Sequence, residues 1–407
     1  MKNVTDRFLD YVRIDTRSSE ESKSTPSTEE QRDLAKLLFK ELSEIGAEDV
    51  FYDEEKCCVY AHIPPAPGFE NRKTLGFIAH MDTSPEISGK NVKPRIIENY
   101  DGEDIVLNTD PEIILSTEKY PEIKEYKGKR LIVTDGTTLL GADDKAGIAE
   151  IMAMAEYFLE NPQVPHCRIS VAFTPDEEVG RGTEGFDLER FGADYAYTVD
   201  GGKLGEFEYE TFNAASAVIE ITGVSVHTGL AKNKMINAAR IAAEFDSMLP
   251  EGQRPEFTEG RDGFFHLSSI EGHTEYAKLN YLLRDHSSEL FDKKKAEIKA
   301  VADILNIRYG EGTVKLTLSD TYRNMREKIE PEFMFLTDNA VSCMKELGIE
   351  PVIRPIRGGT DGSNLSFRGL PCPNICTGGH NFHGRFEYCC IDSMEKIVEL
   401  LIKLAAK

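Results

Sequence analysis

The segment AFTPDEEVG places three consecutive carboxylates, Asp176, Glu177 and Glu178, directly after an apolar run. An acidic cluster at the end of a strand is most often a solvated turn. Carboxylates and imidazoles are also the ligands that hard and borderline metal ions need, and folding brings such ligands together from distant strand ends. A metal site here therefore requires further acids and histidines elsewhere in the chain.

Four other segments offer such ligands. Two polar side chains alternate in the first of them, so an extended backbone points both to the same side. The segments are His80-Met81-Asp82, Asp143-Asp144 before an expected helix, Asp200 before two glycines, and His383 in FHGRFE.

Each segment also has a purely structural interpretation. Asp143 or Asp144 is a suitable helix N-cap, and Asp200 before Gly-Gly is a suitable turn former. His80 and His383 are equally compatible with hydrogen-bonded core histidines. These interpretations are independent, and all of them must hold together if the chain has no metal site.

The elements around these residues indicate an α/β protein. Apolar runs end at His80, at Thr174 and at Asp200, and a helix is expected from about Lys145 to Leu159. Strands that alternate with helices predict a doubly wound, mostly parallel sheet with helices on both faces. Because ligands bind outside the carboxyl ends of such strands, the candidate residues are expected to lie together.

Two further features precede or interrupt this pattern. Ser27 to Glu30 matches a capping box, followed by apolar residues at helical spacing up to Gly46. The connection from Glu86 to Lys129 is long for a compact domain, and we expect the active site to order part of it.

A second domain is predicted between residues 213 and 326. Its expected elements follow the β-α-β-β-α-β order of a ferredoxin-like α+β domain. Residues 1–212 and 327–407 then form one catalytic domain, split in sequence by this insertion. The predicted elements of the insertion are AVIEIT, NAARIAAEFDSML, GFFHLSSI, EYAKLNYLLRD, SSELFDKKKAEIKAVADIL and TVKLTLSD.

Composition excludes several classes of partner. The 407 residues carry a formal net charge of -23, which repels nucleic acid and anionic lipid. The eight cysteines show neither zinc-finger nor thioredoxin spacing, so we interpret them as reduced thiols. Without an apolar leader or an apolar run of membrane-spanning length, the expected location is the cytoplasm.

Taken together, seven motifs resemble the peptidase T family of co-catalytic zinc exopeptidases, which are tripeptide aminopeptidases. The similarity runs from the first helix nearly to the C-terminus, and the insertion interrupts it where that family carries its lid and dimerisation domain. The motifs, in order, are GFIAHMDTSPE, TDGTTLLGADDKAGIAEIM, VAFTPDEEVG, YTVDGG, NAAS, RGGTDG and NFHGRFE.

The resemblance implies a site with two zinc ions, and the sequence leaves open whether manganese or cobalt replaces zinc in the cell. Asp143 would bridge the ions, His80 and Asp200 would complete one, and Glu178 and His383 the other.

Further residues receive roles from the same resemblance. Without the resemblance, His227 would be interpreted only as a histidine that follows a strand, and Arg357 as a surface arginine in a glycine-rich turn. His380 stands where an aromatic residue such as tyrosine is expected. This departure leaves the structure of the pocket rim undecided, but not that of the metal site. The implied roles are general base for Glu177, a hydrogen bond to the ligand imidazole for Asp82, oxyanion donor for His227, and substrate contacts for Arg357 and, more weakly, Asn237 and Arg284.

The sequence therefore predicts an aminopeptidase that acts on short peptides, chiefly tripeptides, as a homodimer formed through the inserted domain. Carboxypeptidases, deacylases and dipeptidases share the metal site, and Asp200, where deacylases and carboxypeptidases carry glutamate, favours release of an N-terminal residue. A binding protein that has lost the reaction would often lack Glu177. A purely structural protein would leave the metal-ligand pattern unexplained.

Overall fold

The computed structural model describes residues 2–407 and divides into two compact units. One contains the chain up to Tyr209 together with Lys328–Arg354 and Thr360–Lys407, and the other contains Glu210–Glu327 and Pro355–Gly359. The short segment Pro355–Gly359, expected in the first domain, clusters with the second unit. Its backbone explains this, because Ile356 N donates to Glu210 O at 2.8 Å and Phe212 N donates to Gly358 O at 3.1 Å.

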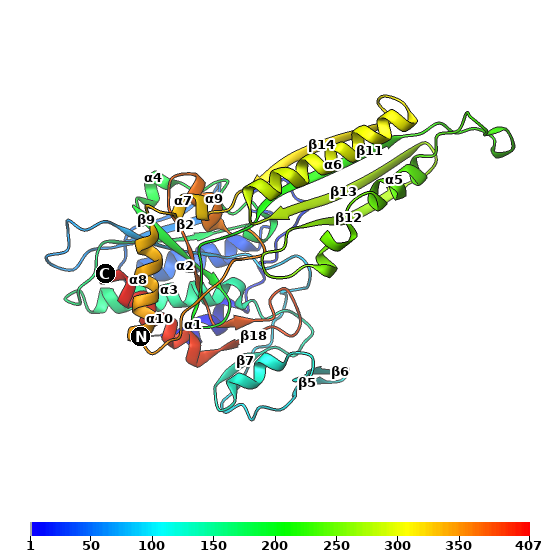
Figure 1. Ribbon diagram of the computed structural model, residues 1–407. Helices are drawn as coiled ribbons and strands as arrows, with labels where there is room; N and C mark the ends of the chain where they lie inside the picture. The colour runs from blue at the N-terminus through cyan, green and yellow to red at the C-terminus, as the bar shows by residue number, and fades with distance from the viewer. Residues whose placement is uncertain (1) are drawn as a thin grey trace. The chain divides into compact units, whose positions relative to one another are not determined.

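The first unit is built on an eight-stranded mixed sheet with the order β1-β2-β8-β3-β9-β16-β10-β15. Figure 1 labels two of these strands, β2 and β9, among the helices of the same unit. The central strands β8, β3, β9 and β16 run parallel, so their carboxyl ends share one edge. The strand bounds are β1 (Glu48–Asp53), β2 (Cys58–Ile63), β3 (Leu75–His80), β8 (Ile169–Thr174), β9 (Tyr195–Gly201), β10 (Glu206–Glu208), β15 (Val352–Ile353) and β16 (Asn374–Cys376).

Helices cover both faces of this sheet, as the alternating pattern predicted. Phe77 and Ala79 of β3 pack into one apolar cluster, whereas Ile78 packs into another on the opposite face. The first cluster includes residues of α1 (Val4–Tyr11), α2 (Gln31–Glu44), α3 (Ala142–Glu160), α8 (Met334–Glu346) and α10 (Ile391–Ala405), and the second includes residues of α4 (Leu188–Phe191) and α9 (Asp361–Phe367).

The long connection after Glu86 is more regular than expected. It folds around its own small core, which includes Tyr100, Leu115 and Ile123, so apolar packing orders it. Its elements are β4 (Arg95–Ile97), the hairpin β5 (Ile105–Thr109) and β6 (Glu112–Leu115), and the 3₁₀ turn η1 (Pro121–Tyr126). Strand β4 continues into a second sheet with β7 (Leu131–Val133), β18 (Tyr388–Cys390) and β17 (Gly379–His380).

The second unit is a ferredoxin-like α+β fold. Its antiparallel sheet has the order β12-β13-β11-β14, and β13 alternates buried and more exposed residues along its length. One face packs against two helices around a core that includes Ile219, Phe245 and Ile298. The elements are β11 (Asn213–Thr222), η3 (Thr228–Leu230), α5 (Ala238–Ser247), η4 (Glu251–Gln253), η5 (Pro255–Phe257), β12 (Phe264–Gly272), β13 (Tyr276–Asp285), α6 (Ser288–Tyr309) and β14 (Val314–Tyr322), with α7 (Arg326–Ile329) spanning the return to the first unit.

Two further observations concern the chain as a whole. Within residues 2–407, no helix has the length and apolar character needed to cross a membrane. All eight cysteines are free thiols, and all are buried.

Candidate metal centre

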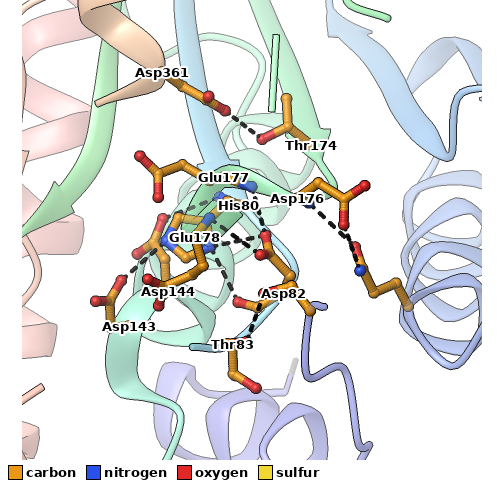
Figure 2. Close-up of polar contacts among 12 residues, drawn as sticks. His80, Asp82, Thr83, Asp143, Asp144, Thr174, Asp176, Glu177, Glu178 and Asp361 are labelled. Carbon is orange, nitrogen blue, oxygen red and sulfur yellow. Dashed lines mark hydrogen bonds and ion pairs between the residues drawn. The ribbon is translucent and has the colours of Figure 1, made fainter. Parts of the chain in front are cut away.

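The candidate ligands of the first unit meet at the carboxyl edge of its parallel strands. Figure 2 shows three of them, His80, Asp143 and Glu178. His80 ends β3 and lies in register with Thr174, the last residue of β8, while Asp200 lies near the end of the neighbouring strand β9. Asp143 stands in the first turn of α3, and its non-helical backbone angles (φ -86°, ψ 103°) leave regular helix only from about Lys145. The sheet therefore brings together residues that are up to 120 positions apart in sequence.

Asp143 lies between two histidines. Its Oδ1 is 2.9 Å from His80 Nε2, and its Oδ2 is 3.1 Å from His383 Nε2. His383 Nε2 also lies 2.9 Å from Glu178 Oε2, and His80 Nε2 lies 3.5 Å from Asp200 Oδ1. The five predicted ligands thus form two sets that share the carboxylate of Asp143.

The chemistry of these donors fits divalent metal ions. His80, Asp143 and Glu178 place ligand atoms within 4.8 Å of one another, and so do His80, Asp144 and Asp200. Glu178 Oε1 and Asp144 Oδ1 are buried without a hydrogen-bond partner among the described residues. Burial raises the pKa of Glu178 to about 8 and that of Asp200 to about 6, because so many like charges are held away from water. Bound cations would compensate this charge.

The three acids of the opening segment point in three directions. Asp176 has a left-handed backbone (φ 57°), and its carboxylate accepts from Ser27 N at 2.8 and 2.9 Å and from Gln31 Nε2 at 2.8 Å. Glu178 faces His383. In residues 2–407 the Glu177 carboxylate shows neither a hydrogen bond nor an ion pair, and burial raises its pKa well above the usual range.

The contact to Asp176 also corrects the predicted capping box. Helix α2 begins at Gln31 and its N-cap is Glu30, and no side chain of the described residues 2–407 caps it. Ser27 N instead donates to the Asp176 carboxylate. The segment that resembles a capping box therefore stabilises the acidic turn.

Asp82 holds both the imidazole and the glutamate turn. His80 Nδ1 lies 3.0 Å from the backbone oxygen of Asp82 and 3.4 Å from its Oδ1. The Asp82 carboxylate accepts from Glu177 N at 2.9 Å and from Glu178 N at 3.2 Å. Asp82 therefore orients the backbone of both glutamates, a contact that the sequence did not suggest.

Two buried acids at this edge were missed by sequence reasoning, although both stand inside the motifs that carry the resemblance. Glu387, the last residue of NFHGRFE, accepts from Leu140 N at 2.6 Å, Gly141 N at 2.8 Å and Asp143 N at 3.2 Å, which holds the Asp143 backbone in place. Asp361, in RGGTDG, accepts from the Thr174 hydroxyl at 2.8 Å. A lone acid gives no periodic or spacing signal, so only its motif points to it.

His380 takes the place of the expected aromatic residue. Its ring stacks on Tyr388 with centroids 4.7 Å apart, and its Nε2 lies 2.6 Å from the Tyr126 hydroxyl. Burial lowers the pKa of His380 to about 4, so the ring is neutral near pH 7 and accepts the hydroxyl proton. The imidazole thus fills an aromatic position.

The other predicted residues lie in the second unit. His227 is exposed, and its Nδ1 accepts from Gly229 N at 3.2 Å, so the proton of the neutral ring is on Nε2. Asn237 is the N-cap of α5, where its side chain accepts from Arg240 N at 3.3 Å.

The two arginines contact backbone oxygens of that unit. Arg357 donates to Gly260 O at 2.9 Å, to Asp262 O at 3.0 Å and to Thr258 Oγ1 at 3.0 Å. Arg284 Nη1 donates to Arg357 O at 3.1 Å. In this conformation the Arg357 guanidinium holds the 258–262 loop.

Similarity to known proteins identifies the family. The peptidase dimerisation domain matches residues 209–313. A peptidase T from Alkaliphilus oremlandii is 56% identical over 405 residues, which cover 99% of this chain and 98% of the relative. This chain belongs to the peptidase T family. Another peptidase T, from Caldanaerobacter subterraneus, is 54% identical over 404 residues and covers 99% of this chain and 98% of its own length.

Solved structures agree with the fold of the peptidase T family. The aminopeptidase PepT of Bacillus cereus superimposes with a TM-score of 0.76 at 23% identity, and a tripeptidase of Staphylococcus aureus does so with 0.78 at 21%; each match covers 99% of this chain and 97% of the other. A Bacillus subtilis protein described as a dinuclear metal binding peptidase gives 0.66 at 14% identity and covers 99% and 96%. The predicted α/β fold with its inserted domain is confirmed.

Proposed function

We propose that this member of the peptidase T family is an aminopeptidase that uses two zinc ions to release the N-terminal residue of tripeptides. The observation that carries the proposal is the placement of the Asp143 carboxylate between His80 and His383, with the Glu177 carboxylate, unpaired among residues 2–407, in the adjoining turn. Names and descriptions of the relatives, peptidase T and tripeptidase among them, support the substrate class.

In this proposal the five ligands divide between the two ions. Asp143 would be a ligand of both ions, His80 and Asp200 would hold one, and Glu178 and His383 would hold the other. When bound, a pair of zinc ions polarises the scissile carbonyl and lowers the pKa of a bound water from about 15.7 toward about 7.

Glu177 is the general base. It takes a proton from the attacking water and gives it to the leaving amine as the carbon–nitrogen bond breaks. Burial raises the pKa of the Glu177 carboxyl, so it binds a proton more strongly than an exposed glutamate does. A positioned base contributes about 10²–10⁴ in rate. The amides of Glu177 and Glu178 donate to Asp82, which keeps the base in position.

His227 stabilises the oxyanion of the tetrahedral intermediate. The contact from Gly229 N to Nδ1 leaves the Nε2 proton for donation, the requirement for an oxyanion donor. Arg357 binds the peptide carboxylate by exchanging its contacts to Thr258, Gly260 and Asp262, with Asn237 and Arg284 as weaker candidates for substrate contacts.

The second unit serves as lid and dimerisation domain, and the match of residues 209–313 to the peptidase dimerisation domain supports a homodimer. Sedimentation velocity at micromolar concentration tests this, and a monomer under these conditions contradicts it. Mixing Glu177→Ala protein with His227→Ala protein shows whether His227 acts across the dimer, because activity returns only in that case. A cytoplasmic location is supported by eight free thiols, which persist in reducing compartments.

The direct test is mass spectrometry of the products from Leu-Gly-Phe. Free leucine and Gly-Phe are expected, with activity lost on removal of metal and regained with zinc. Free phenylalanine and Leu-Gly would make the chain a carboxypeptidase, and the absence of any cleavage would point to acylated amino acids as substrates.

A further inference from the structure

We propose that Asp361 binds the α-ammonium group of the peptide substrate and thereby selects a free N-terminus. This inference rests on the proposed function, since it concerns substrate recognition at the same site.

The reaction itself determines where such a group must lie. The α-nitrogen of a peptide is two bonds from the carbonyl carbon that is attacked, and it is largely protonated at neutral pH. An acceptor for it must therefore stand beside the base and the metal ligands, and a carboxylate forms the strongest hydrogen bonds to ammonium.

Most acids at this edge are already engaged. They either accept backbone amides or carry the proposed chemistry. Asp144 Oδ1 has no partner among residues 2–407, but Asp144 is fully buried and so is closed to a substrate cation. The acids that accept amides are Asp82, Asp144, Asp176 and Glu387, and those with proposed chemical roles are Asp143, Glu177, Glu178 and Asp200.

Asp361 differs from these acids. Its hydrogen-bond donor among residues 2–407 is the Thr174 hydroxyl, at 2.8 Å from Oδ2, and it makes no ion pair there although it is only 4% exposed. Burial raises the pKa of Asp361 to about 7, against the effect of the Thr174 hydrogen bond, as expected for a buried carboxylate that lacks a cation. A substrate ammonium would supply that missing charge.

The position of Asp361 meets the requirement set by the reaction. Thr174 is paired with His80 across β3 and β8, and such strands lie about 4.8 Å apart, so Asp361 is held one side chain away from the ligand histidine. Figure 2 shows Asp361 above Glu177, and the charge of Asp361 is among those that raise the pKa of Glu177 after burial.

Gly182 provides independent support for this position. A Cβ built on Gly182 would lie 2.2 Å from Asp361 Oδ1, although the backbone of Gly182 is not left-handed. The glycine is therefore required for space, and it lets the carboxylate stand where it does. Gly182→Ala must displace the carboxylate without removing it.

The test compares Leu-Gly-Gly with its desamino analogue, 4-methylpentanoyl-Gly-Gly, in which hydrogen replaces the α-ammonium. Asp361→Asn keeps an acceptor for the Thr174 hydroxyl and removes the charge. We expect kcat/KM for Leu-Gly-Gly to fall about 10- to 150-fold, the effect of one charge-assisted hydrogen bond, while the inhibition constant of the analogue changes less than about 3-fold. Gly182→Ala should show the same pattern, a lower kcat/KM for Leu-Gly-Gly with a nearly unchanged inhibition constant for the analogue.

Controls separate this inference from the proposed function. Zinc content is expected to be unchanged in Asp361→Asn, and Glu332→Gln, which removes one exposed acid of the same unit, is expected to behave as the unaltered protein. An equal loss for substrate and analogue in both variants would overturn the inference and leave Asp361 a structural clamp on Thr174. Failure of the unaltered protein to cleave Leu-Gly-Gly would instead overturn the proposed function.

Discussion

Replacement of His380 by phenylalanine should remove a source of acid sensitivity. The folded protein holds this imidazole with a pKa of about 4, against an ordinary value of 6.5. Because the folded state binds fewer protons than the unfolded state between these values, the stability contribution is complete above pH 6.5 and is lost as the pH falls toward 4. Between pH 7.5 and pH 5.0, His380 alone should cost about 2 kcal/mol of unfolding free energy.

The variant separates this effect from packing. Phenylalanine keeps the stack on Tyr388 but removes the acceptor for the Tyr126 hydroxyl, so the variant should be about 1 kcal/mol less stable at pH 7.5. At pH 5.0 the order should reverse, since only the unaltered protein carries the titrating imidazole.

Urea unfolding followed by far-ultraviolet circular dichroism at both pH values measures the difference. All other titrating groups are common to the two proteins. The change between pH 7.5 and pH 5.0 in the difference between their unfolding free energies therefore reports the titration of His380. His273→Gln, which removes an exposed imidazole, controls for loss of a histidine as such. Parallel stability profiles for the unaltered protein and His380→Phe would refute the reasoning, because His380 would then titrate alike in both states.

Three further predictions concern the metal centre and the second unit. Glu177→Ala should keep near-normal zinc content by atomic absorption while hydrolysis falls by about 10²–10⁴ or more; retained activity would remove Glu177 from the role of base. Asp143→Ala should lose metal and activity together, and full occupancy of both metal positions would contradict the bridging assignment. Asn237→Ala should lower the stability of the second unit by about 1 kcal/mol through loss of the α5 cap, which thermal unfolding measures, and an unchanged transition would show that the cap contributes nothing.

Periodic and positional signals made much of the fold predictable. The ends of β3 and β9, and hence the neighbourhood of His80 and Asp200, follow from apolar runs that stop at a polar residue. The βαββαβ order of the second unit is readable in the same way, because each element has its own hydrophobic period.

Contacts between distant backbone groups gave no such signal. Asp176 stands beside Glu177 in sequence, yet it caps a loop 149 residues away through Ser27 N. Glu387 and Asp361 act on backbone and hydroxyl groups that only the folded chain brings near. The direction in which an acid points depends on one local angle, such as the positive φ of Asp176, and not on its residue type.

The return of Pro355–Gly359 to the second unit bears on how the protein can be dissected. A gene fragment that encodes only Glu210–Glu327 would omit the peptide that accepts from His286 Nε2 and from Arg284 Nη1 through Ile356 O and Arg357 O. The second unit is therefore not formed by one continuous segment of the chain. Any transplanted version must carry these five residues on a linker or be expressed as two complementing pieces.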